Sequence, residues 1–179
     1  MRLAAVLCLL VLVSTPSWSQ EQPDDPRPEA RAVFEHLSFL QGEWDAENWL
    51  ARGPNDSETL TFVVTTSSVF DGLGLNSRWV SADSGNWFGT VINTYDPATG
   101  TMAVRYFNGN TNRWSLTEQE IELTETGFVT HFSGTDGYGA FEGRTRLERV
   151  SDDQYRQTIE RKYETTDWFL IDRLEATRR

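Results

Sequence analysis

The stretch that decides the fold is residues 37–44, Leu-Ser-Phe-Leu-Gln-Gly-Glu-Trp. Its first half continues an apolar pattern at helical spacing that begins before it, at Val33, Leu37 and Leu40. Gly42 predicts the end of this helix, because glycine readily adopts the left-handed backbone that terminates helices. From Trp44 onward the apolar pattern has a period of two, which is typical of β-strands. We therefore expect one short amphipathic helix followed by an all-β chain.

Ten segments with this period follow one another, separated by tight-turn sequences such as Asp-Pro-Ala-Thr-Gly at 96–100. We expect strands at 43–50, 58–70, 75–82, 86–95, 101–108, 112–123, 127–134, 138–149, 154–164 and 167–176. No helical pattern interrupts them, so the pattern predicts an antiparallel meander, and a meander removes its exposed edges most simply by closing into a barrel. The apolar positions of 112–123 change parity between Leu116 and Ile121, which predicts a β-bulge there.

The N-terminus resembles a secretory signal peptide over residues 1–19: a basic start, an apolar run and a small-x-small ending. The apolar run is shorter than the roughly 20 residues that a membrane-spanning helix needs, so a retained anchor is the less favoured alternative. A polar, proline-containing leader at 20–28 and one domain at 29–179 complete the expected organisation. We expect an exported protein, periplasmic or extracellular, and the pattern does not separate the two. The only cysteine, Cys8, lies in the signal, so no disulfide is expected.

The chain is acidic, with a formal net charge of −11 at pH 7 and no basic stripe. An acidic surface repels phosphate backbones, which argues against nucleic-acid partners. The sequence does not indicate an oligomeric state.

Alternation along the strands assigns side chains to the inside or the outside of the expected barrel. Within 154–164, for example, the charged set is outside and the set that includes Tyr155 and Gln157 is inside. We predict an aromatic cavity wall that displays a few hydrogen-bonding groups to a small, partly apolar ligand. The predicted ligand-binding residues are Trp79, Trp87, Asn93, Tyr106, Tyr155, Gln157 and Arg161. Alternatively, Arg161 pairs with an inward acid or reaches water at the barrel rim, because charges are seldom buried alone.

No catalytic or metal-binding pattern accompanies these residues. The chain has two histidines, His36 and His131, and no Gly-x-Ser-x-Gly elbow or cluster of metal ligands. We therefore predict no catalytic residue, no metal and no cofactor. Two alternatives to ligand binding remain: an enzyme acting inside the same cavity, with Asp172 as the candidate acid or base, and an interaction module with a solid barrel.

Residues 37–44, together with Val-Phe-Asp-Gly-Leu at 69–73 and Thr-Tyr-Asp-Pro-Ala-Thr-Gly at 94–100, resemble the calycin superfamily. Within it, the chain is similar to lipocalins and nitrobindins, and most of all to a family of exported bacterial domains of unknown function. The resemblance implies a small-molecule-binding barrel whose signature residues are Gly42 and Trp44, with Trp44 packed beneath an arginine of the last strand, matched here to Arg173. Nitrobindins bind haem through a histidine near their C-terminal strands, whereas no histidine follows His131, so haem binding is not expected here.

Overall fold

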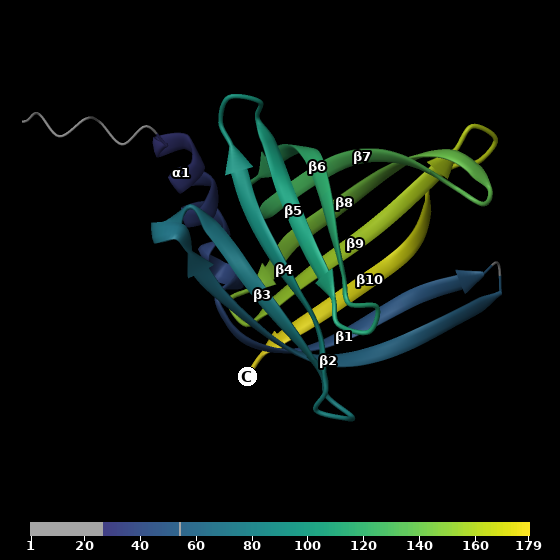
Figure 1. Ribbon diagram of the computed structural model, residues 1–179, viewed down its shortest axis with the longest axis horizontal. Coiled ribbons are helices and arrows are strands. Elements are labelled where there is room, and N and C mark those ends of the chain that lie inside the picture. The colour runs from purple at the N-terminus through teal and green to yellow at the C-terminus, as the bar shows by residue number, and fades with distance from the viewer. Residues whose placement is uncertain (1–26, 54) are drawn as a thin grey trace, which may run out of the picture.

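Ten strands form a closed antiparallel barrel with one helix over one of its ends (Figure 1). The computed structural model describes residues 27–53 and 55–179. The predicted signal peptide and nearly all of the predicted leader therefore lie outside the described residues. The all-β barrel predicted from the sequence is confirmed, and each predicted strand has a counterpart in the structure. The strands are β1 (Gly42–Gly53), β2 (Asp56–Val69), β3 (Gly74–Ser81), β4 (Trp87–Asp96), β5 (Thr101–Asn108), β6 (Arg113–Thr124), β7 (Gly127–Asp136), β8 (Gly139–Ser151), β9 (Gln154–Tyr163) and β10 (Phe169–Arg178).

The sheet follows the order of the chain, and β1 pairs with β10 to close it. Apart from this pair, all neighbouring strands in the barrel are consecutive in sequence. Short hairpins therefore suffice for nearly all connections. A short 3₁₀ turn, η2 (Phe70–Gly72), joins β2 to β3.

The helical lead-in covers one end of the barrel. It consists of α1 (Pro28–His36), with proline and Glu29 in its first turn, and a 3₁₀ turn, η1 (Leu37–Leu40). Its buried side chains are Ala30, Val33, Phe34, Leu37 and Leu40. Most of them join the hydrophobic core, so this end of the barrel is filled and closed.

Trp44 is the central side chain of the closed end and is 1% exposed. Its indole N–H donates to the Leu40 carbonyl at 2.9 Å, and the edge of its ring meets Tyr155 with 4.8 Å between the ring centroids. The guanidinium of Arg178 lies over the Trp44 indole ring, 4.2 Å from the ring centroid. The same guanidinium donates to the carbonyls of Phe39 and Gln41, both at 3.1 Å.

The prediction that Arg173 covers Trp44 is therefore wrong, and Arg178 has that role. The register between the first and last strands places Trp44 directly opposite Arg178, whereas Arg173 lies opposite Trp49. Arg173 is exposed on the outer face, between inward-facing neighbours such as Leu174.

Gly42 has two reasons to be glycine. Its φ of +123° is a conformation that side-chain-bearing residues rarely adopt. A Cβ atom at this position would also lie 2.6 Å from Nη1 of Arg178. The predicted helix stop is thus also the position that leaves room for the arginine over Trp44.

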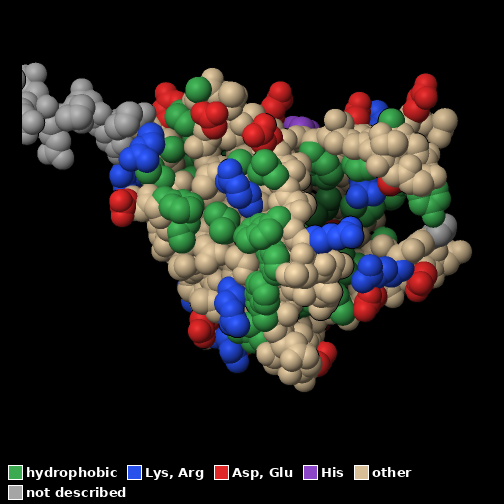
Figure 2. Space-filling model, viewed as in Figure 1, with side chains coloured by type: hydrophobic (Ala, Val, Ile, Leu, Met, Phe, Trp, Pro, Cys, Tyr) green, Lys and Arg blue, Asp and Glu red, His purple; other side chains and the backbone are tan. Residues whose placement is uncertain are grey.

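The opposite end of the barrel is splayed. Strands β6 and β7 pair only between Glu120–Thr124 and Gly127–His131, so the first half of β6 and the second half of β7 separate. In Figure 1 the β7–β8 and β9–β10 hairpins lie above the β1–β2 hairpin at this end, and Figure 2 shows an opening between them.

The predicted bulge in β6 is wrong. The pairing of β6 with β5 and β7 continues without a register shift from Arg113 to Thr124. The parity change in the sequence arises because Trp114 and Leu116 lie on the outer face, where they are 60% and 56% exposed. Apolar side chains were assigned to the inside, and these two are exceptions.

Candidate ligand cavity

A cavity of about 840 Å³ occupies the barrel interior between the helical end and the splayed end. The predicted alternative of a solid barrel is therefore not what the structure shows. At the helical end the cavity is lined by apolar side chains that also belong to the hydrophobic core, namely Leu37, Leu40, Val64, Leu75, Met102, Phe128, Leu147 and Leu174. The closed end of the cavity is thus suited to an apolar group.

Polar side chains line the cavity on two walls. Asn93, Tyr106 and Gln119 project from the adjacent strands β4, β5 and β6. Gln157 projects from β9, which is on the opposite side of the closed sheet. Because strands alternate their faces, the inward position of each follows from its register with apolar lining residues: Asn93 opposes Val104, and Gln157 opposes Leu147 and Leu174.

These four side chains have free hydrogen-bonding capacity. None of them makes a side-chain hydrogen bond to a residue that the structure describes, and none of their polar atoms is among the buried, unpaired ones. Their amide and hydroxyl groups therefore remain accessible from the cavity. Partial burial raises the pKa of the Tyr106 hydroxyl, so it remains a donor at neutral pH.

Asp172 and Asn48 both line the cavity, and the Asp172 carboxylate is paired with the Asn48 amide. Nδ2 of Asn48 donates to Oδ1 of Asp172 at 2.7 Å and reaches the Arg173 carbonyl at 3.3 Å. Burial raises the pKa of Asp172, and the hydrogen bond from Asn48 opposes part of that rise. Asp172 faces inward by the regular alternation of β10, on the same face as the buried Leu174 and Ala176, and its pairing with Leu50 continues the register with β1 without a shift.

Five of the seven predicted ligand-binding residues line this cavity: Trp79, Asn93, Tyr106, Tyr155 and Gln157. Their placement is as predicted, while their part in binding remains a prediction. The indole nitrogen of Trp79 is buried and has no acceptor among the described residues, so Trp79 contributes its ring to the wall. Tyr155 is packed against Trp44 at the closed end, and its burial raises its pKa.

Trp87 does not line this cavity. Trp79 of β3 pairs with Gly89 of β4, but the next residue, Val80, pairs with Trp87. Phe88 is therefore an extra residue in β4, and its side chain lines the cavity in place of Trp87. Trp87 is 41% exposed and stacks on Phe107, with 5.1 Å between the ring centroids. Glycine at position 89 also leaves room for the Tyr106 ring, because a Cβ atom there would lie 2.9 Å from that ring.

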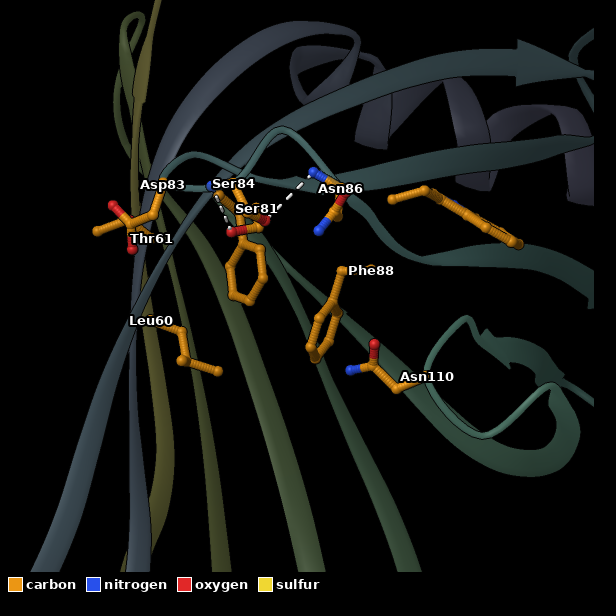
Figure 3. Close-up of a pocket in the computed structure, with 10 residues that line it drawn as sticks. Leu60, Thr61, Ser81, Asp83, Ser84, Asn86, Phe88 and Asn110 are labelled. Atoms are coloured by element: carbon orange, nitrogen blue, oxygen red, sulfur yellow. Dashed lines mark hydrogen bonds between the residues drawn. The ribbon is translucent and has the colours of Figure 1, made fainter.

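A second, smaller hollow of about 240 Å³ lies beside the β3–β4 hairpin. Figure 3 shows Phe88 between Leu60 and Asn110, with Ser81 and Asn86 at the hairpin. The hairpin is held by local hydrogen bonds, including one from the Ser84 amide to the Ser81 hydroxyl at 3.3 Å. Phe88 and Leu60 line both spaces, so this hollow adjoins the main cavity at its open end.

Arg161 also lies outside the cavity lining, and the alternative prediction for it is confirmed. It faces inward but beyond the cavity, where Nη1 donates to Oδ2 of Asp136 at 2.9 Å and the guanidinium lies 4.2 Å from the Phe141 ring centroid. The Tyr163 hydroxyl donates to the same Asp136 oxygen at 2.6 Å. This hydroxyl bond is the main cause that holds the pKa of Asp136 below its ordinary value. The arginine is paired with an acid on the splayed hairpins.

The cavity lining also contains polar residues that were not among the predicted ones, including Asn48, Gln119 and Asp172. Asn48 and Gln119 follow the alternation of β1 and β6 and were accessible to sequence reasoning. Asp172 likewise follows the alternation of β10, on the same face as Leu174 and Ala176.

No protein-family model matches the chain, and no curated protein matches it. Among solved structures, the chain is similar to the one entitled "Crystal Structure of Rv2717c from M. tuberculosis", with a TM-score of 0.49 and 11% sequence identity. The match covers 82% of this chain and 97% of that one. Within the part of the chain that the structure describes, no helix combines the length and apolar character that crossing a membrane requires.

Proposed function

We propose that this chain is an exported, calycin-like protein that binds a small, partly apolar molecule inside its barrel. The observation that carries the proposal is the set of cavity-lining amides and hydroxyl at Asn93, Tyr106, Gln119 and Gln157, which make no side-chain hydrogen bond to any described residue. Interior polar groups without partners are costly unless water or a ligand satisfies them. A binding cavity is a physical reason for four of them to face one space.

The shape of the cavity supports the same proposal. Its volume of about 840 Å³ is within the range typical of small-molecule sites, which is roughly 300–1,000 Å³. An apolar closed end, with Leu37 and Leu40 on its floor, is combined with polar groups on the walls. This arrangement suits an amphipathic ligand that inserts its apolar part toward the helix.

Export is the part of the proposal that rests on sequence alone. The basic start, apolar run and small-residue ending of residues 1–19 support it. Fusing residues 1–26 to a reporter enzyme that is active only outside the cytoplasm should give reporter activity, and substituting two arginines for Leu9 and Leu10 should abolish it. Equal activity of the two fusions would refute export by this segment.

Ligand binding is tested with a matched pair of substitutions on adjacent residues of β4. Val91 lines the cavity, whereas Ile92 alternates to the outer face, so Val91→Trp fills the cavity and Ile92→Trp adds the same side chain outside. A neutral fluorescent hydrophobe, N-phenyl-1-naphthylamine, serves as the probe. We expect bright, saturable binding by the natural protein and by Ile92→Trp, and at least tenfold weaker binding by Val91→Trp.

Two outcomes would contradict the proposal. One is the absence of saturable binding of any neutral hydrophobe by the natural protein. The other is unchanged affinity in Val91→Trp, measured on a variant whose circular dichroism spectrum and melting transition show that it is folded.

A further inference from the structure

We propose that the cavity selects amphiphiles with a cationic head, such as protonated alkylamines, over carboxylates of the same chain length. This inference rests on the proposed function and adds to it the class of ligand. It is carried by the charges of the cavity wall, and specifically by Asp172.

The cavity lining contains three charged side chains: Arg52, Glu58 and Asp172. Arg52 and Glu58 neutralise each other, because Nε of Arg52 donates to Oε2 of Glu58 at 2.9 Å. The lining therefore has one carboxylate in excess, and no cation within it is left to receive a ligand carboxylate.

Asp172 has no ion pair with any described residue. Its hydrogen-bond partner is the neutral amide of Asn48, which donates to Oδ1. Its cross-strand neighbours are the apolar Leu50 on β1 and Ile159 on β9, and both also line the cavity. The second carboxylate oxygen thus has no cationic partner among residues 27–53 and 55–179.

The nearest inward arginine on the neighbouring strand does not compensate this charge. Arg161 is one inward position beyond Ile159, but its guanidinium is bonded to Asp136 and lies over Phe141. Arg161 is thus paired with Asp136, whereas Asp172 faces the cavity without an arginine partner among the described residues.

A partly buried carboxylate without a counter-ion favours a ligand that supplies one. An ammonium head beside Asp172 would form a charge-assisted hydrogen bond in a partly dry environment. A carboxylate head at the same place would put two like charges together. The aromatic residues of the wall, including Tyr106 and Trp79, present π-faces that also attract cations.

The net charge of the protein also favours a cationic ligand. The chain has a formal net charge of −11, so cations are concentrated around the protein and anions are repelled. The apolar tail of such a ligand would occupy the closed end near Leu37 and Leu40.

The test compares three ligands that differ only in the head group: octylamine, octanol and octanoate. Each displaces N-phenyl-1-naphthylamine from the natural protein, from Asp172→Asn and from Glu118→Gln at pH 7.5 and low salt. Glu118 is exposed on the outer face of β6, so Glu118→Gln makes the same change of net charge away from the cavity. Asparagine at 172 keeps the shape of aspartate and an oxygen that accepts from Asn48.

We expect the natural protein and Glu118→Gln to bind octylamine about tenfold more tightly than octanol, and octanoate the least, because one ion pair of this kind contributes on the order of 1.4 kcal/mol. In Asp172→Asn the preference for octylamine should disappear, while octanol binds as before. An amine preference that persists in Asp172→Asn would overturn the assignment to Asp172. If Asp172→Asn is not folded by its melting transition, the ranking of the three ligands on the natural protein decides, and octanoate binding as tightly as octylamine overturns the inference.

Failure of this inference is distinguishable from failure of the proposed function. Octanol binding without an amine preference leaves the cavity as a binding site and removes only the charge selectivity. Absence of binding by the probe and by all three ligands removes both.

Discussion

Replacing Arg178 with alanine tests how the closed end of the barrel is stabilised. The guanidinium joins the last strand to the start of the barrel: it belongs to β10, lies over Trp44 of β1, and bonds the carbonyls of Phe39 and Gln41 just before β1. Removing the guanidinium takes away the cation–π contact with the Trp44 ring and the donor to two backbone carbonyls.

The magnitude follows from these contacts. Two hydrogen bonds from a charged donor to backbone carbonyls contribute about 1 kcal/mol each after competition with water. The contact with the Trp44 ring adds about 1 kcal/mol. The Arg178 side chain is 35% exposed, which lets water replace part of what is lost. We therefore expect Arg178→Ala to lower the free energy of unfolding by about 2 to 3 kcal/mol, or the melting temperature by about 8 °C.

The assay is urea unfolding followed by tryptophan fluorescence, with Arg173→Ala as the matched control. Arg173 is on the same strand, its side chain is 47% exposed, and its Nε atom is 4.0 Å from Glu175. Such a surface pair contributes at most about 0.5 kcal/mol, so Arg173→Ala should unfold almost like the natural protein. Arg178→Lys should fall between the two, because lysine keeps the charge but lacks the planar fork that reaches both carbonyls. A larger loss in Arg173→Ala than in Arg178→Ala, or equal small losses in both, would refute this account of the closed end.

Two further substitutions test other parts of the structure. Gly143→Ala should lower the free energy of unfolding by about 1 to 3 kcal/mol, because the new Cβ would lie 2.3 Å from the Phe132 ring; Gly137→Ala, with no atom within 4 Å of its Cβ, should cost almost nothing, and equal stability of the two variants would count against this packing. Asp172→Asn should be more stable than the natural protein at pH 7 to 8. Burial raises the folded-state pKa of Asp172 above its unfolded value of about 3.9, so above the raised pKa the charged carboxylate destabilises the folded state. The stability advantage of Asp172→Asn therefore shrinks as the pH falls through the raised pKa, and it is absent below about 3.9. Thermal melts across this pH range check the sign, and a constant difference between the two proteins would contradict it.

Much of the cavity wall could be predicted from the sequence, and a local irregularity of the sheet explains why Trp87 does not belong to it. Asn93, Tyr106 and Gln157 lie on strands whose alternation is regular near them, so their inward facing followed from their neighbours. Trp87 lies beside a register shift, where the extra residue Phe88 reverses the face expected for Trp87. The sequence carries no clear signal for such a shift.

By itself the sequence determined the local features of this protein. The helix, its end at Gly42, the ten strands and their turns follow from side-chain periodicity and turn chemistry, which act over a few residues. Only the tertiary structure decided which residues meet across the barrel. The pairing of β1 with β10 places Arg178, and not Arg173, opposite Trp44, and the separation of β6 from β7 accompanies an interior that is hollow. Register and closure are set by contacts between strands distant in sequence, and a periodicity of two is the same for every even shift of one strand along another.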